Sequence, residues 1–252
     1  MPVKTSGSIS VQDLVNEFGG TDPHAFNEYY RGGSLVPATP NSGRNNAIPS
    51  VVGSQMKLGD FYGSSKTVVV SYDIIGAGGA GGKGYADGGG SNDRTPSASG
   101  GPTSISTFGV TADGGLAGIN GQNGVVSGQA GEGTVYGPGG AGRTRTTDNN
   151  GSFPGNDAPN SSYGAGGGGG PGDAGNTYDS SGEGGGGGLA GERLTGTRTV
   201  NYGSTVSFVV GIGGVSSTNT GRPGGDGANG LVKISYDGIN RTFTSSGSTV
   251  IN

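Results

Sequence analysis

Glycine recurs at every third position over several stretches of this chain, and this spacing limits what the chain can fold into. Four such runs are Gly115–Gly124, Gly166–Gly175, Gly182–Gly191 and Gly221–Gly230. An earlier stretch, Gly76–Gly84, carries glycine in two phases of the same period. Three residues per turn is the period of a left-handed helix of the polyproline II type, which makes no internal hydrogen bonds. Its N–H and C=O groups must therefore find partners in neighbouring segments.

A packed array of such helices is the fold that this spacing favours. A collagen triple helix fits poorly, because the runs are short and interrupted and the other two positions seldom hold proline. A flexible linker would not require its glycines to recur at a fixed period. Ordering glycine costs more conformational entropy than ordering any other residue, so only an array that satisfies nearly every backbone group offsets that cost. We therefore expect short polyglycine II helices, folded back and forth side by side, in place of a hydrophobic core.

The overall composition excludes several classes of protein. The chain has 252 residues, of which 62 are glycine and 12 are proline, and its net charge is −4. The basic surface that nucleic-acid binding requires is missing. Cysteine is absent, which excludes disulfides and thiolate chemistry. No apolar run reaches membrane-spanning length and no signal pattern opens the chain, so we expect a protein made in a cytoplasm, neither secreted nor inserted into a membrane.

β-Strands are expected on both sides of the glycine runs. One strand opens at Thr67, and three strand-like segments close the chain at Thr205–Ile212, Leu231–Tyr236 and Arg241–Ile251. Asp237-Gly238, between the last two, is a two-residue hairpin signal. Residues 66–252 are therefore predicted to form one Gly-rich domain, mainly irregular and β, in which strands frame the polyglycine II helices.

Residues 1–65 have a different composition and are predicted to form a small module of short helices. Ser10 is a candidate N-cap for a helix that the Gly19-Gly20 pair ends. The Asp22-Pro23 pair is suited to open a second helix, which would end at Gly32-Gly33.

The module contains a faint internal repeat and most of the large aromatic side chains. Ile9–Leu14 (ISVQDL) is echoed by Met56–Phe61 (MKLGDF), with Asp at the same place. The aromatic residues would supply either the packing of the module or a docking surface. The candidates for attachment are Phe18, Phe26, Tyr29, Tyr30, Phe61 and Tyr62.

No cofactor, metal or catalytic set is expected. Gly76-x-Gly78-x-x-Gly81 after a strand looks like a dinucleotide-binding fingerprint, which also needs a following helix and an acidic residue at the end of a second strand. The next twenty or so residues allow neither, so the match is a by-product of the triplet spacing. His24, the only histidine, lies beside aromatic residues and favours packing or docking. A glycan-cleaving enzyme would need paired carboxylates on rigid elements, whereas the acids here are scattered in loops.

Segments rich in Ser, Thr, Asn, Asp and Tyr break the glycine runs at residues 85–103, 143–163, 173–183 and 215–223. If the runs stack, these segments emerge as loops at the ends of the stack, where binding residues usually lie. Their alternative role is that of solvated connectors. The candidates for receptor contact are Tyr85, Arg94, Arg143, Arg145, Phe153, Tyr163 and Tyr178.

Two parts of the sequence resemble known bacteriophage proteins. The first part looks like a short module common in virion structural and tail-fibre proteins of tailed phages. The stretches that carry this resemblance are ISVQDLVNEFGG, EYYRGGSLVP and GSQMKLGDFYGSS. The second part is similar to the Gly-rich domain at the ends of such proteins, in the stretches VVVSYDIIGAGGAGG, TSISTFGVTADGG and GGDGANGLVKISY. This domain also resembles the distal adhesins of T-even-type tail fibres. In that family, polyglycine II helices form a sandwich and the loops at its tip contact the host receptor.

The resemblance implies a non-enzymatic virion protein of the tail or fibre. Residues 1–65 would dock onto other tail or fibre subunits, and the Gly-rich domain would present loops to a host-surface glycan or outer-membrane protein. The alternative is a purely structural tail or baseplate component in which the Gly-rich array is a rigid spacer. An ice-binding protein built on a similar array would need a flat face of repeated Thr or Ala, and the variable triplet positions are too mixed for that.

Overall fold

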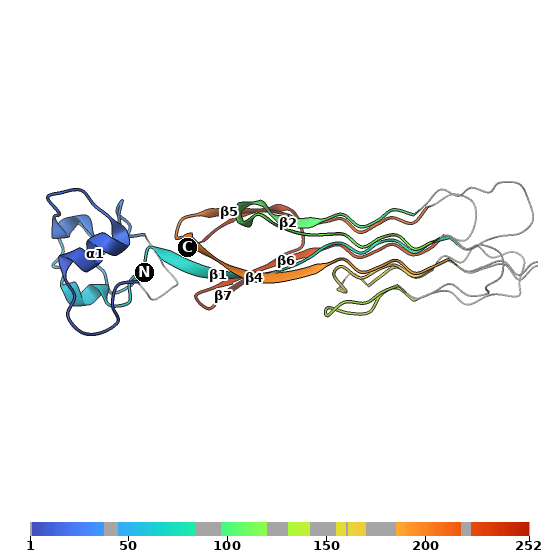
Figure 1. Cartoon of the computed structure of the whole chain (residues 1–252), viewed down its shortest axis with the longest axis horizontal. Coiled ribbons are helices and arrows are strands. Elements are labelled where there is room, and N and C mark those ends of the chain that lie inside the picture. Colours follow the sequence, from blue (N-terminus) through green and yellow to red (C-terminus); the bar gives the residue numbers. More distant parts are fainter. Residues whose placement is uncertain are drawn as a thin grey trace, which may run out of the picture.

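The computed structural model describes residues 2–37, 45–83, 97–119, 131–141, 155–159, 161–169, 185–217 and 223–251. The molecule is long and narrow, with three parts in a row: the N-terminal module, two β-sheets, and an array of extended Gly-rich segments (Figure 1). Both chain termini lie near the junction of the module and the sheets, while the array extends in the opposite direction (Figure 1).

The first helix of the module forms as the sequence predicts. α1 spans Val11–Phe18, and Ser10 caps it. The Ser10 N–H donates to Oδ2 of Asp13 over 2.8 Å, and the Asp13 N–H donates to Oγ of Ser10 over 3.3 Å, which makes a reciprocal capping box. Gly19 ends the helix with a φ of 82°, a conformation that favours glycine.

The second predicted helix is wrong in its extent, because only a short 3-10 turn forms, at Phe26–Glu28. In a 3-10 turn, side chains three residues apart lie directly above one another. Phe26 and Tyr29 have this spacing, and both rings pack on the ring of Phe61, with centroid distances of 5.6 and 6.4 Å. Aromatic packing therefore decides the local conformation here.

The internal repeat of the module is a repeat of local structure. The second copy also begins a helical turn, a 3-10 helix at Leu58–Phe61. The Lys57 N–H donates to Oδ2 of Asp60 over 2.8 Å, which matches the bond between Ser10 and Asp13 in the first copy. The sixth residue of each copy, Leu14 and Phe61, is fully buried in the core of the module.

A compact set of polar contacts joins the module to the sheets. The Oε1 atom of Glu17 accepts hydrogen bonds from Oγ of Ser65 over 2.9 Å and from the Lys66 N–H over 2.7 Å. The buried side chain of Asn45 pairs with both the N–H and the C=O of Ser65. The strand that begins at Thr67 is thus held to the module at its first residues.

The strands form two four-stranded antiparallel sheets. The first sheet, in spatial order, consists of β4 (Arg193–Asn201), β1 (Thr67–Ile75), β6 (Leu231–Tyr236) and β7 (Ile239–Phe243). The second consists of β3 (Val110–Ala112), β2 (Thr103–Ile105), β5 (Thr205–Val209) and β8 (Gly247–Val250). Alternate residues of β1 point inward, and the two sheets enclose one hydrophobic cluster that includes Val70, Ile105 and Ile234.

The predicted hairpin is confirmed, whereas other strand predictions need correction. Tyr236 pairs with Ile239 across Asp237-Gly238, and both turn residues have positive φ, at 44° and 77°. Arg241–Ile251 is two strands, β7 and β8, which belong to different sheets. β2, β3 and β4 lie inside the Gly-rich middle, where no strand was predicted.

Six strands continue directly into the Gly-rich segments, which we call the glycine array. β1, β3 and β5 lead out of the sheets into residues 76–83, 113–119 and 210–217, and β2, β4 and β6 are entered from residues 97–101, 185–192 and 223–230. The array also contains residues 131–141, 155–159 and 164–169 (Figure 1). The sheets therefore fix where most segments of the array begin.

Hydrogen bonds within the array repeat with a period of three. Successive N–H groups of residues 76–82 donate to three different segments in turn. The groups that donate to residues 185–192 are those of Gly76, Gly79 and Gly82. Those of Ala77 and Ala80 donate to residues 97–101, and those of Gly78 and Gly81 donate to residues 223–230.

Two segments of the array are surrounded on all sides. Residues 76–83 are bonded to six neighbours, and so are residues 164–169. The neighbours of the first are residues 97–101, 113–119, 164–169, 185–192, 210–217 and 223–230. Those of the second are residues 76–83, 131–133, 139–141, 155–159, 185–192 and 223–230. Every residue of both inner segments is buried.

Close backbone contacts explain why the inner segments require glycine at most positions. A Cβ atom added to Gly79 would lie 2.1 Å from the carbonyl oxygen of Leu116, and one added to Gly81 would lie 2.0 Å from that of Gly168. Both distances are far below any van der Waals contact. The remaining triplet position of residues 76–83 holds Ala77 and Ala80, both completely buried. Backbone packing thus replaces side-chain packing in this part of the molecule.

Candidate functional site

The far end of the array is the first candidate site, because the sequence predicts receptor-contact loops there. The described segments of the array end at that side, away from the sheets (Figure 1). Six of the predicted contact residues lie outside the described residues, in sequence intervals that follow or precede those ends. These residues are Tyr85, Arg94, Arg143, Arg145, Phe153 and Tyr178.

Tyr163, the seventh candidate, lies at the opposite end of the array, beside the first sheet. Its ring packs edge-to-face on the ring of Tyr136, with centroids 6.1 Å apart. Its carbonyl oxygen accepts a hydrogen bond from Oγ1 of Thr134 over 2.9 Å. Tyr163 therefore helps to hold the 131–141 hairpin in place, and it does not lie at the far end of the array.

A polar cluster holds this hairpin against the outer face of the first sheet. The Tyr136 hydroxyl donates to Oδ2 of Asp73 over 2.6 Å. Arg193 binds the same carboxylate in bidentate fashion, with both N–O distances at 2.9 Å. Lys233 lies over the Tyr136 ring, 4.3 Å from its centroid. Three strands and the hairpin thus contribute to one cluster.

The electrostatics of the cluster favour an ionised carboxylate and a neutral phenol. Burial alone would raise the pKa of Asp73, but the hydrogen bonds from Arg193 and Tyr136 and the charges of Arg193 and Lys233 outweigh it and lower that pKa below its usual value. Burial and the bond to Asp73 raise the pKa of Tyr136 to about 12. The carboxylate is fully engaged, so the arrangement suits a structural clamp better than an acid–base site.

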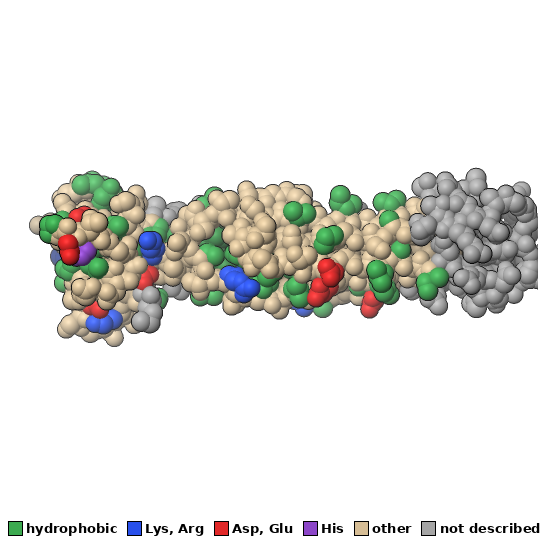
Figure 2. Space-filling model, turned by 45° about the horizontal axis from the view of Figure 1, so that its top comes forward, with side chains coloured by type: hydrophobic (Ala, Val, Ile, Leu, Met, Phe, Trp, Pro, Cys, Tyr) green, Lys and Arg blue, Asp and Glu red, His purple; other side chains and the backbone are tan. Residues whose placement is uncertain are grey.

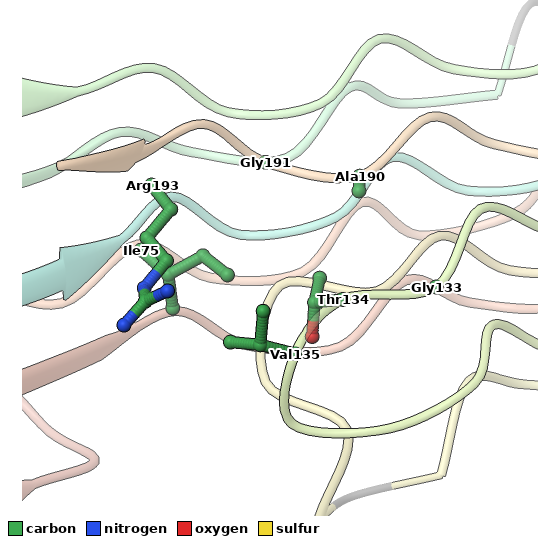
Figure 3. Close-up of a pocket in the computed structure, with 7 residues that line it drawn as sticks. All are labelled: Ile75, Gly133, Thr134, Val135, Ala190, Gly191 and Arg193. Carbon is green, nitrogen blue, oxygen red and sulfur yellow. The ribbon is translucent and has the colours of Figure 1, made fainter.

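An open pocket of about 410 Å³ lies next to this cluster (Figure 3). Ile75, Val135 and Ala190 provide much of its apolar lining, and Arg193 lies at one side (Figure 3). The polar head of Arg193 is bound to Asp73, so the pocket contains few groups that could orient a ligand. We assign no ligand to it.

The described residues contain no group of His, Asp and Glu side chains arranged to hold a metal ion. They also contain no helix long and apolar enough to span a membrane. The Nε2 atom of His24 lies 3.0 Å from Oδ1 of Asp22. Its Nδ1 atom is buried without a hydrogen-bond partner, which agrees with a packing position in the module.

The attachment candidates separate into two groups in the structure. Phe18, Tyr29 and Phe61 are buried in the core of the module, and Phe26 packs against it. These four therefore take the packing role, one of the two that the sequence left open. Tyr30 and Tyr62 retain exposed surface, and the Tyr62 hydroxyl donates to the carbonyl oxygen of Gly7. Phe26, Tyr30 and Tyr62 therefore keep surface that a partner could contact.

Sequence reasoning missed the clamp of Asp73, Tyr136, Arg193 and Lys233. A signal for it was present, because Asp73 and Lys233 are the charged residues at outward positions of two otherwise uncharged strands. The partner Tyr136 carried no such signal, since it lies in a Gly-rich hairpin with no regular pattern. Pairing of β1 with β6 brings Asp73 directly opposite Lys233.

Searches for similar proteins found no match to a family model, a curated protein or a solved structure.

Proposed function

We propose that the chain is a bacteriophage virion protein, a tail-fibre or adhesin component. Residues 1–65 dock it onto other virion subunits, and the far end of the glycine array faces the host surface. The sequence resemblance to phage tail-fibre modules motivates this proposal. The observation that carries it is the polarity of the molecule: the module lies at one end, and the array points away from it (Figure 1).

We also infer that the array segments are polyglycine II helices. The hydrogen bonds of residues 76–82 change neighbour at each residue and return to the same neighbour at every third residue. A helix with three residues per turn directs its N–H groups in that way. Two complete rings of six neighbours agree with hexagonal packing of such helices. Rigid packing of this kind suits a part that must hold recognition residues far from the particle.

Binding of the purified, labelled protein to cells of candidate host bacteria tests the adhesin proposal. The test variant is R143A/R145A, which changes two candidates between described ends of the array. The matched control is R31A/R198A, which removes the same charge from the module and from β4 and leaves the contacts of Asp73 intact. We expect saturable binding by the native chain and the control, and loss of binding by the test variant. Equal binding by all three chains would remove these arginines from the contact.

A loop replacement extends the test to the whole interval. Residues 142–153 are exchanged for a Gly/Ser segment of the same length. Residues 155–159 are kept, because Gly155, Asn156 and Ala158 donate backbone hydrogen bonds within the array. Absence of binding by the native chain to every strain that the parent virus infects would overturn the adhesin proposal.

The second candidate function is a structural spacer in the tail or baseplate. One observation favours it: large aliphatic side chains stand exposed along the side of the array, among them Leu116 and Ile212. Contacts with neighbouring subunits would cover them. The location of the array in the virion separates the two functions, since a spacer is enclosed by other subunits and an adhesin ends in solvent.

A further inference from the structure

One side of the glycine array is uncharged and apolar. It is formed by residues 97–101, 114–119 and 210–217, none of which is Asp, Glu, Lys, Arg or His, and the exposed Asp113, three residues before Leu116, bounds it on the side of the sheets. Four aliphatic side chains stand out from it: Leu116 is 63% exposed, Ile119 78%, Ile212 75% and Val215 54%. We call this surface the aliphatic face. Hydrophobic side chains protrude along the array between the sheets and the far end (Figure 2).

The aliphatic face has two ridges and a valley between them. Residues 97–101 bond to residues 113–119 on one side, through Gly100 and Gly115, and to residues 210–217 on the other. Leu116 and Ile119 form the first ridge, and Ile212 and Val215 form the second. The valley contains Ala98 and Ser99, whose side chains are small. At about 3.1 Å per residue, side chains three residues apart leave a gap of about 9 Å along each ridge.

The two ridges are out of step along the axis of the molecule. Gly115 and Gly118 donate to the carbonyls of Ala77 and Ala80, whereas Gly214 donates to that of Gly78. Counted from these bonds, the side chains follow one another along the axis in the order Ile212, Leu116, Val215, Ile119. Each ridge therefore has a side chain at the height of a gap in the other ridge.

We propose that the aliphatic face binds the same face of a second copy of the chain, side by side and pointing in the same direction. A twofold axis parallel to the long axis places each ridge against the other ridge of the partner copy. Because the ridges are out of step, Leu116 and Ile119 enter the gaps beside Ile212 and Val215 of that copy. The face is uncharged, so self-pairing brings no like charges together although the chain carries a net charge of −4.

Sedimentation velocity over a range of concentrations tests the association. We expect dimers to accumulate as the native chain is concentrated, since mass action favours association. The variant L116S/I212S should raise the dimer dissociation constant by about tenfold or more. The control V69S/V135S changes exposed aliphatic residues outside the face and should leave that constant unchanged. A native chain that stays monomeric, or variants that all dimerise alike, would overturn the proposal.

Disulfide trapping tests the direction of the pairing, and the absence of native cysteine makes it clean. The parallel arrangement places Leu116 of one copy nearer in height to Val215 of the other copy, about one residue away, than to Ile212, about two residues away. L116C and V215C chains should therefore cross-link when mixed and oxidised, and each alone should not. Cross-linking of L116C with itself would instead indicate an antiparallel pair and contradict the proposal. The test uses no bacterial cells, so its outcome is independent of the adhesin proposal.

Discussion

Single glycines have unequal importance in this molecule, and the difference depends on what surrounds each Cα. Gly79 lies between backbones on all sides, whereas Gly247 in β8 has no atom closer than 3.8 Å to the place of a Cβ. Gly109 and Gly203 have positive φ and open space around them. The same residue type thus serves close packing in the array and backbone conformation in the turns.

Gly79→Ala should destabilise the fold by about 3 kcal/mol or more, because the added methyl meets the Leu116 carbonyl and cannot move away from it. Gly247→Ala should change the free energy of unfolding by less than about 1 kcal/mol. Thermal unfolding of the two variants and the native chain measures the difference. Equal melting temperatures for the two variants would contradict the close packing of residues 76–83.

The clamp at Tyr136 should give the stability of the protein a dependence on pH at both ends of the scale. The pKa of Asp73 is lowered on folding, so its contribution is present above the ordinary aspartate value and is lost as the pH falls through the folded pKa. The pKa of Tyr136 is raised to about 12, so its contribution is present below the ordinary tyrosine value of about 10 and is lost between there and about 12.

Tyr136→Phe should reduce the alkaline loss of stability, to which Tyr29 also contributes through its raised pKa, and should weaken the acid loss, because the phenol no longer donates to Asp73. At neutral pH the variant should unfold about 1 kcal/mol more easily. Denaturant unfolding at a series of pH values provides the measurement. An unchanged alkaline limb in the variant would show that another group causes it.

Elements of the module are defined by their first residues. α1 begins at a capping box, and the turn at Leu58–Phe61 begins with the same aspartate contact. The two elements end at Phe18 and Phe61, which are both buried in the core of the module. They therefore share the contact that begins them and the core into which they pack. Neither is long enough to be a stable helix alone, and tertiary packing supplies the remainder.

Ser10→Ala should lower the stability of the module by about 1 kcal/mol, since the N–H of Asp13 loses its side-chain acceptor and keeps only the Ser10 carbonyl. Gln12→Ala, on the exposed side of the same helix, serves as the matched control and should have a smaller effect. Circular dichroism near the helical minimum follows the change, because α1 is the one α-helix among the described residues. A larger effect of the control would contradict the capping role.

How far the sequence predicts these elements depends on where their hydrogen bonds go. The helix at Ser10 and the hairpin at Asp237-Gly238 rest on local signals, and both predictions are confirmed. β4 was missed because its sequence, RLTGTRTVN, is polar, and it forms through a full-length pairing with β1. The period of the glycine runs is visible in the sequence, but their neighbours are not, since one glycine backbone offers the same groups as another.

The site could be predicted only in part for the same reason. Tyr163 lies at the end of the polar segment 143–163, which is predicted to be a loop, yet its neighbour is the ring of Tyr136 in the hairpin. The aromatic residues of the module share one composition signal, and burial alone separates Phe61 from Tyr62. Long-range contacts decide these cases, and no local pattern specifies them.

The whole molecule depends on the joint between the module and the sheets. Glu17→Ala removes the acceptor of two hydrogen bonds, which Oγ of Ser65 and the N–H of Lys66 donate. Local opening should increase, and trypsin should cut after Lys66 several-fold faster. Glu28→Ala, elsewhere in the module, is the control. Electrophoresis shows release of the module over time, and equal rates for both variants would exclude Glu17 as a brace.

The direct continuation of six strands into the array has a mechanical consequence. A force that pulls the far end away from the module runs along the array segments and into the strands that continue them. The hydrogen bonds between neighbouring segments are then loaded in shear, and many of them carry the force at the same time. The joint at Ser65 and Lys66 is a single chain crossing held by few bonds. Under tension the molecule should therefore yield there first, with the array and the sheets still intact.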